Sequence, residues 1–135
     1  MKKLFFAVLL ISLATGCKKA KEVQEDLVIM AMTDGQWKVS SFTLNSTNIT
    51  TDFTNYRFKY YSNRTVDAIN NGTVEKNGTW EGNSSSMTIS AGFTGAIYPL
   101  SLINGTWIIT RNGWTYVEAT QTNGTEVKTL RLDKV

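Results

Sequence analysis

The stretch TWIITRNGWTYVEATQTNGTEVKTLRL, residues 106–132, decides the fold of this 135-residue chain. Three runs rich in β-branched and aromatic residues are separated by the dipeptides Asn112-Gly113 and Asn123-Gly124. Asn-Gly suits the type I′ turn of a β-hairpin, in which both central residues need a positive φ. The stretch therefore predicts three consecutive antiparallel strands with a hairpin turn at each Asn-Gly pair.

The same period-two pattern continues upstream as far as residue 37. In YRFKYY, for example, Tyr56, Phe58 and Tyr60 share one face of a strand, and basic residues share the other. Together with the opening stretch, this predicts eight strands: residues 37–44, 56–61, 65–69, 73–81, 87–91, 106–111, 114–121 and 126–132.

The tetrapeptide Asn-Gly-Thr-Trp occurs twice, beginning at Asn77 and at Asn104. The Asn77-Gly78 pair follows Asn71-Gly72 too closely for both to be tight turns between strands of ordinary length. We therefore predict that Gly78 lies inside the fourth strand, at a bulge or bend, and that the second copy lies at the start of the sixth strand. The two copies share composition and do not mark an internal repeat.

Eight short antiparallel strands need their edges hidden, and closing the sheet into a barrel removes the edges. A two-sheet sandwich is the alternative, but it uses crossing connections, and only residues 45–52 and 92–103 form linkers long enough for one. We therefore expect an all-β fold, an eight-stranded antiparallel up-and-down barrel over residues 33–135. A short helix within residues 22–32 is expected to precede it, although LVIMAM could equally form a strand.

The first predicted strand carries apolar residues on both faces. Trp37 and Val39 share one face, and Phe42 and Leu44 share the other. Because a regular strand buries one face only, this pattern predicts either a bulge or a covered outer surface.

Composition excludes several kinds of chemistry. The chain has no histidine and a single cysteine, Cys17, which rules out His-dependent nucleophiles, His-ligated zinc and thiolate metal cages. Asp67, Glu75, Glu81 and Glu118 lie on predicted strands, and two of them could in principle form a glycosidase pair, but strand carboxylates usually face solvent. We expect no enzymatic activity, no cofactor and no metal.

The N-terminus has the pattern of a targeting segment. Lys2 and Lys3 precede an apolar run at residues 4–13, which is too short to span a bilayer and suits the apolar region of a signal peptide. Removing those two lysines from the 14 basic residues leaves 12 against 11 acidic residues. A nearly neutral mature domain gives no electrostatic reason to expect nucleic-acid binding.

The sequence Ala14-Thr15-Gly16-Cys17 resembles the lipobox of bacterial lipoprotein signal peptides, although the usual leucine stands one place further back, at Leu13. The resemblance implies removal of residues 1–16 and acylation of Cys17, so that residues 17–32 tether the domain to a bilayer. Because Lys18 follows the cysteine, the resemblance further implies sorting to the outer membrane of the cell envelope. The alternative is a plain secretory signal with an incidental cysteine.

Gly35-Gln36-Trp37, at the start of the first strand, resembles the G-x-W signature of lipocalins and related calycins. The resemblance implies a barrel in which Trp37 packs at the closed end with a basic residue of the last strand across it, and Arg131 is the matching candidate. The chain is shorter than a typical lipocalin, lacks its disulfides, and is similar to compact lipocalin-like domains of small envelope lipoproteins.

The lipocalin resemblance implies a small apolar or amphipathic ligand inside the barrel. Aromatic side chains give such a cavity apolar area, with a polar atom on Tyr and Trp. Three alternatives stay open: these residues simply fill the core, they form an exposed face for sugars, or the domain is a monomeric structural or protein-interaction module with a filled barrel. The candidate lining residues are Tyr56, Phe58, Tyr60, Trp80, Trp107, Trp114 and Tyr116.

Overall fold

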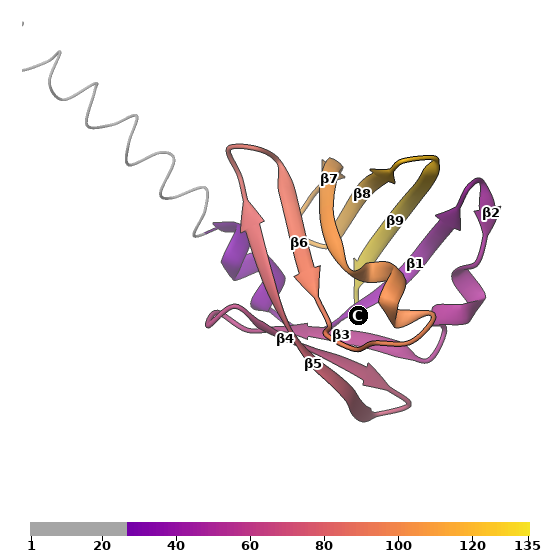
Figure 1. Cartoon of the computed structure of the whole chain (residues 1–135). Coiled ribbons are helices and arrows are strands. Elements are labelled where there is room, and N and C mark those ends of the chain that lie inside the picture. Colours follow the sequence, from indigo (N-terminus) through magenta and orange to yellow (C-terminus); the bar gives the residue numbers. More distant parts are fainter. Residues whose placement is uncertain (1–26) are drawn as a thin grey trace, which may run out of the picture.

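A computed structural model describes residues 27–135 of the chain (Figure 1). The expected signal peptide, Cys17 and the first part of the tether lie outside the described residues. Residues 27–33 are helical, and two 3-10 helices follow, η1 (Thr50–Phe53) and η2 (Leu100–Ile103). The strands are β1 (Trp37–Leu44), β2 (Thr47–Asn48), β3 (Tyr56–Tyr60), β4 (Thr65–Asn70), β5 (Thr73–Asn83), β6 (Thr88–Gly92), β7 (Gly105–Asn112), β8 (Tyr116–Asn123) and β9 (Glu126–Lys134).

The strands form a closed antiparallel barrel. Strands β3 to β9 pair in chain order, and β1 closes the ring by pairing with β9 on one side and with β3 on the other. Strand β2 has two residues and pairs with β1, so eight strands make the barrel wall. The predicted all-β, eight-stranded, up-and-down barrel with a short preceding helix is confirmed, and all eight predicted strands are present.

A bulge resolves the two-sided apolar pattern of the first strand. In the pairing of β1 with β9, Val39 lies opposite Leu132 and Ser41 opposite Arg131, which leaves Ser40 without a partner. The extra residue reverses the alternation, so that Trp37, Val39 and Phe42 are all buried.

The tight type I′ turns lie at other positions than predicted. Asn112-Gly113 and Asn123-Gly124 were expected to form them, but the β7–β8 hairpin turns at residues 114–115, and Gly113 keeps a negative φ. At the β8–β9 turn Gly124 alone has a positive φ, the pattern of type II′. Both central residues have a positive φ at 45–46 and at 71–72, where Asn71-Gly72 joins β4 to β5.

Strand β5 contains the first Asn-Gly-Thr-Trp, as predicted, but its bulge lies upstream of Gly78. Ala68 of β4 pairs with Lys76 and Ile69 with Val74, so Glu75 is the extra residue. Gly78 is required for a different reason. A Cβ atom there would lie 2.5 Å from the carbonyl oxygen of Gly92 and 2.7 Å from the Phe93 ring.

The two ends of the barrel can be told apart by the connections they carry. Residues 27–33 lie at the end where β1 begins and where the β3–β4, β5–β6 and β7–β8 turns gather, and we call this the helix end. The opposite end carries η1, η2 and the β8–β9 turn, and we call it the 3-10 end (Figure 1). Across residues 27–135, no helix has the length and apolar character to cross a membrane.

Candidate functional site

Five of the seven predicted lining residues point into the barrel, where they belong to a packed core. Phe42 stacks on Phe53 at a ring-centroid distance of 4.8 Å and meets Trp107 edge-on at 5.9 Å. From Phe53 the ring contacts continue at 6.0–6.3 Å through two further aromatic residues to Phe93, and a Tyr60–Trp80 pair at 5.3 Å lies beside them. The five buried candidates are Tyr56, Phe58, Tyr60, Trp80 and Trp107.

These distances lie in the range of favourable aromatic pairs, so the rings that were expected to line a cavity contact one another across the interior. The polar side-chain atoms of three of them also form hydrogen bonds. The Trp80 Nε1 donates to the Tyr61 carbonyl at 2.9 Å, and the Trp107 Nε1 donates to the Ile103 carbonyl at 2.8 Å. The Tyr56 hydroxyl donates to Glu75, and burial together with that carboxylate raises the pKa of Tyr56 to about 12.

The other two candidates do not join this cluster. Trp114 lies at the tip of the β7–β8 hairpin with 57% of its surface exposed. Tyr116 is half-buried on the outer face of the barrel, against the guanidinium groups of Arg111 and Arg131. The hairpin turns two residues later than predicted, which removes Trp114 from the strand.

Trp37, the residue expected at the closed end of the barrel, is fully buried at the helix end. Its Nε1 donates to the carbonyl of Met32 at 2.9 Å, which fixes the helical residues against the barrel. Gly35, with a φ of 74°, makes the turn between helix and strand. The cation across the ring is Lys134, whose Nζ lies 5.1 Å from the ring centroid, in place of the predicted Arg131.

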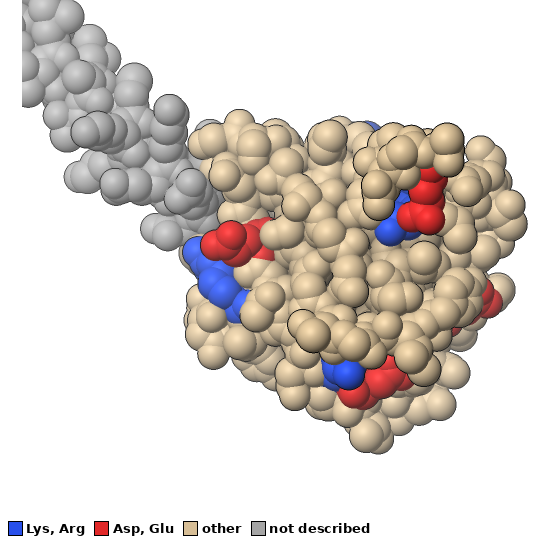
Figure 2. Space-filling model, viewed as in Figure 1, with Lys and Arg blue, Asp and Glu red and all other residues tan. Residues whose placement is uncertain are grey.

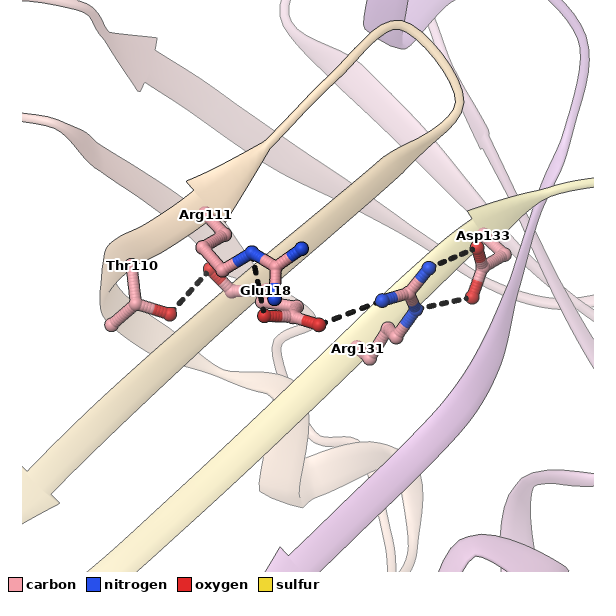
Figure 3. Close-up of polar contacts among 5 residues, drawn as sticks. All are labelled: Thr110, Arg111, Glu118, Arg131 and Asp133. Atoms are coloured by element: carbon pink, nitrogen blue, oxygen red, sulfur yellow. Dashed lines mark hydrogen bonds and ion pairs between the residues drawn. The ribbon is translucent and has the colours of Figure 1, made fainter.

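Strand alternation explains why Arg131 does not reach Trp37. Leu130 and Leu132 face the interior, so Arg131 between them faces outward, whereas Lys134 continues the inward series. On the outer face Arg131 lies between two carboxylates: its Nη1 donates to Glu118 at 2.7 Å, and its Nε and Nη2 donate to Asp133 at 2.9 and 3.1 Å (Figure 3).

This outer-face cluster is electrostatically compensated. The hydrogen bonds from Arg131 lower the pKa of Asp133, with help from Ser40 and Lys38, and the two carboxylates raise the pKa of Arg131. Glu118 also lies 3.7 Å from Arg111. Because each charge already has a partner of opposite sign, the cluster stabilises the β8–β9 surface more readily than it would hold a charged ligand.

Two of the three remaining candidate carboxylates also make structural contacts, and the third, Glu81, is exposed. Glu75 accepts from Tyr56 and Asn70, and Asp67 accepts from Tyr61 and Asn77. In residues 27–135 no group of three potential metal-binding side chains comes together. Most of the surface visible in Figure 2 is uncharged, and most of its acidic patches adjoin basic ones.

An apolar cavity of about 60 Å³ lies under the helical residues at the helix end. Val28, Ala31 and Met32 cover it, while Ile89, Ile109 and other residues of the barrel wall form its floor. It opens beside a shallower groove bounded by Leu27, Ala31 and Trp114. Sequence reasoning missed this cavity because its lining comes from the helix, two turns and five strands, none of which carries a distinctive motif.

The 3-10 end is closed differently. Phe53 of η1 and Leu100 and Ile103 of η2 are buried against the aromatic cluster. The amino group of Lys128 is also buried there, where it donates to the Leu102 carbonyl at 2.9 Å and lies 5.4 Å from the Trp107 ring.

Comparisons with known proteins give the fold only. No protein-family model matches the chain, and no curated protein sequence matches it either. A crystal structure of a DUF4847 family protein from Bacteroides vulgatus ATCC 8482 superposes with a TM-score of 0.54 at 11% sequence identity. The match covers 78% of this chain and 96% of that one, and it supports the barrel architecture.

Proposed function

We propose that this chain is a lipid-anchored, non-enzymatic domain of the cell envelope, with a filled barrel that meets a protein partner on its outer surface. The lipobox resemblance at Ala14–Cys17 supports the anchor and, with Lys18, a place at the outer membrane. The near balance of charge in the mature domain supports a protein or lipid environment in preference to nucleic acid. We further propose that the domain is a monomer without a cofactor.

The observation that carries this proposal is the continuous series of ring contacts across the interior. A lipocalin-like carrier needs an enclosed space that buries most of its ligand, typically several hundred Å³. Here the same aromatic residues that would line such a space occupy it, from Trp107 through Phe42 and Phe53 to Phe93. The filled interior therefore favours the interaction module over a carrier with a central ligand.

The anchor is tested in the native host with Cys17→Ser in the full-length chain. We expect the unaltered protein to sediment with membranes and the variant to be released, because the acyl chains supply the membrane affinity. A variant that still sediments with membranes after a high-salt wash contradicts the anchor.

The filled interior is tested on protein purified from those membranes. Native mass spectrometry is expected to give the mass of the acylated chain without further bound lipid, and added fatty acids should leave the emission of the three buried tryptophans unchanged. A stoichiometric lipid that is released only by organic extraction would contradict the filled barrel and restore the central carrier.

The cavity at the helix end favours a second candidate, binding of a small apolar group there. Its volume of about 60 Å³ exceeds the roughly 10–15 Å³ that one water requires by the same measure, but it would accommodate only part of an acyl chain. Ala31→Phe should fill the cavity and abolish such binding, whereas Ala96→Phe near the 3-10 end should leave it intact. Equal binding by both variants, measured by calorimetric titration with short-chain fatty acids, would exclude this site.

A further inference from the structure

The helical residues 27–33 are apolar on the side that faces away from the barrel as well as on the side that faces it. Val28 and Met32 cover the cavity, while Leu27 and Met30 point outward, and Met30 is 60% exposed. A surface helix of a soluble domain normally carries polar residues on its outer side. The apolar outer side indicates that another apolar surface covers it.

Two further exposed apolar side chains lie around this helix. Trp114 bounds the same groove as Leu27, and Met87 lines the cavity that the helix covers. Both are more than 40% exposed, and both lie at turns of the helix end. We call the group Leu27, Met30, Met87 and Trp114 the apolar rim.

The chain itself limits what can cover the rim. About ten residues separate Cys17 from Leu27, and a chain of that length reaches at most about 35 Å even when fully extended. The tether joins the domain at Leu27, which belongs to the rim. If Cys17 is acylated, the rim is therefore the part of the domain that lies nearest the bilayer. Lys18, Lys19 and Lys21 in the tether add attraction to anionic headgroups.

We propose that the apolar rim rests in the headgroup region of the bilayer that holds the anchor, so that the helix end faces the membrane and the 3-10 end faces away. Tryptophan suits this position because its ring is apolar while its N–H can reach polar headgroups. The inference rests on the lipid anchor proposed above and adds an orientation to it. It leaves the outer wall and the 3-10 end for a protein partner.

The tryptophans of this chain allow a direct test. Of the four, Trp37, Trp80 and Trp107 are buried and Trp114 is exposed. Full-length protein purified from host membranes is reconstituted into vesicles of phosphatidylcholine and phosphatidylglycerol, with and without bromine atoms on the acyl chains near the headgroups. We expect brominated lipid to quench Trp114 and its emission to shift to shorter wavelength on reconstitution, and Trp114→Phe should lose both effects.

The matched control moves the reporter to the other end of the barrel. Ile97, in the β6–β7 connection at the 3-10 end, is 74% exposed, so Ile97→Trp in the Trp114→Phe background should be neither quenched nor shifted. Equal quenching of the two reporters would overturn the proposed orientation. Protection of Trp114 from an aqueous quencher without bromine quenching would assign the rim to a protein or a second copy and also overturn it.

Vesicle flotation in the same samples separates this inference from the anchor. Protein that floats with the vesicles but shows no quenching at Trp114 would support the anchor and contradict the proposed orientation. Protein that does not float contradicts the anchor, and the orientation fails with it.

Discussion

The two ends of the barrel are both closed, but the 3-10 end is closed by the core itself and the helix end by a separate cover. At the 3-10 end Phe53, Leu100 and Ile103 are continuous with the aromatic cluster. At the helix end an apolar helix lies over a cavity and leaves Met30 and Trp114 exposed. The difference indicates that the 3-10 end is built for stability, whereas the helix end retains space beneath its cover that a stable core alone would not need.

The largest effect is expected where the core closes the barrel. Phe53→Ala removes a ring stacked on Phe42 and should lower the free energy of unfolding by about 3–5 kcal/mol. Urea unfolding followed by far-UV circular dichroism measures the change, with Ile97→Ala at the same end as an exposed control. A loss no larger than that of the control would mean that η1 is not part of the core.

A smaller loss is expected from the cover of the helix end. Met32 is buried, but it borders existing space, so the helix can settle into part of the volume that Met32→Ala vacates. We expect a loss of about 2 kcal/mol, near the lower limit for such substitutions. The same urea unfolding compares it with Phe53→Ala, and a larger loss for Met32→Ala would reverse the contrast between the two ends.

The buried amino group of Lys128 at the 3-10 end should contribute less to the free energy of unfolding than either Phe53 or Met32. Lys128→Met keeps most of the apolar stem and removes the hydrogen bond to Leu102, so a loss of about 1–2 kcal/mol is expected. Lys38→Met, at an exposed position on β1, serves as the control with little change. Increased stability of Lys128→Met would show that desolvation of the ammonium outweighs its contacts.

The smallest effect is expected on the outer face, where charges are partly solvated. Asp133 has a lowered pKa in the folded state, so its contribution is present above about pH 4 and is lost as the pH falls through the lower folded pKa. Asp133→Asn should cost about 0.5 kcal/mol at pH 7 and weaken the decrease in stability on acidification. Urea unfolding at pH 7 and pH 3 measures both effects. An identical pH dependence of stability in the unaltered protein and in Asp133→Asn would contradict a lowered pKa of Asp133.

The sequence was sufficient for the architecture because the strands alternate strongly and the turns are rich in Asn and Gly. The two-sided apolar pattern of the first strand predicted either a bulge or a covered outer surface, and the bulge at Ser40 brings Trp37 and Phe42 to the same face. The type of each turn was not predictable to the same degree. Pairing across the sheet fixes the strand ends, and at Asn112-Gly113 it moved the turn by two residues.

The candidate site was predictable in part. Five of the seven aromatic candidates lie inside the barrel, but residue type cannot distinguish a ring that lines a space from one that fills it. Arg131 could have been rejected from the sequence, because it alternates with the inward Leu130 and Leu132. The cavity under the helix depends on how segments distant in sequence pack together, and no local pattern reports that.

The seam between β1 and β9 joins nearly the first described residues to nearly the last, since Trp37 pairs with Lys134. Every other pair of neighbouring strands in the wall comes from segments that are closer along the chain. The β1–β9 pairing therefore has the largest entropic cost of loop closure and should form late in folding. A growing or translocating chain would therefore remain an open sheet with two unprotected edges until β9 emerges, and deleting residues 126–134 should leave it prone to associate edge to edge.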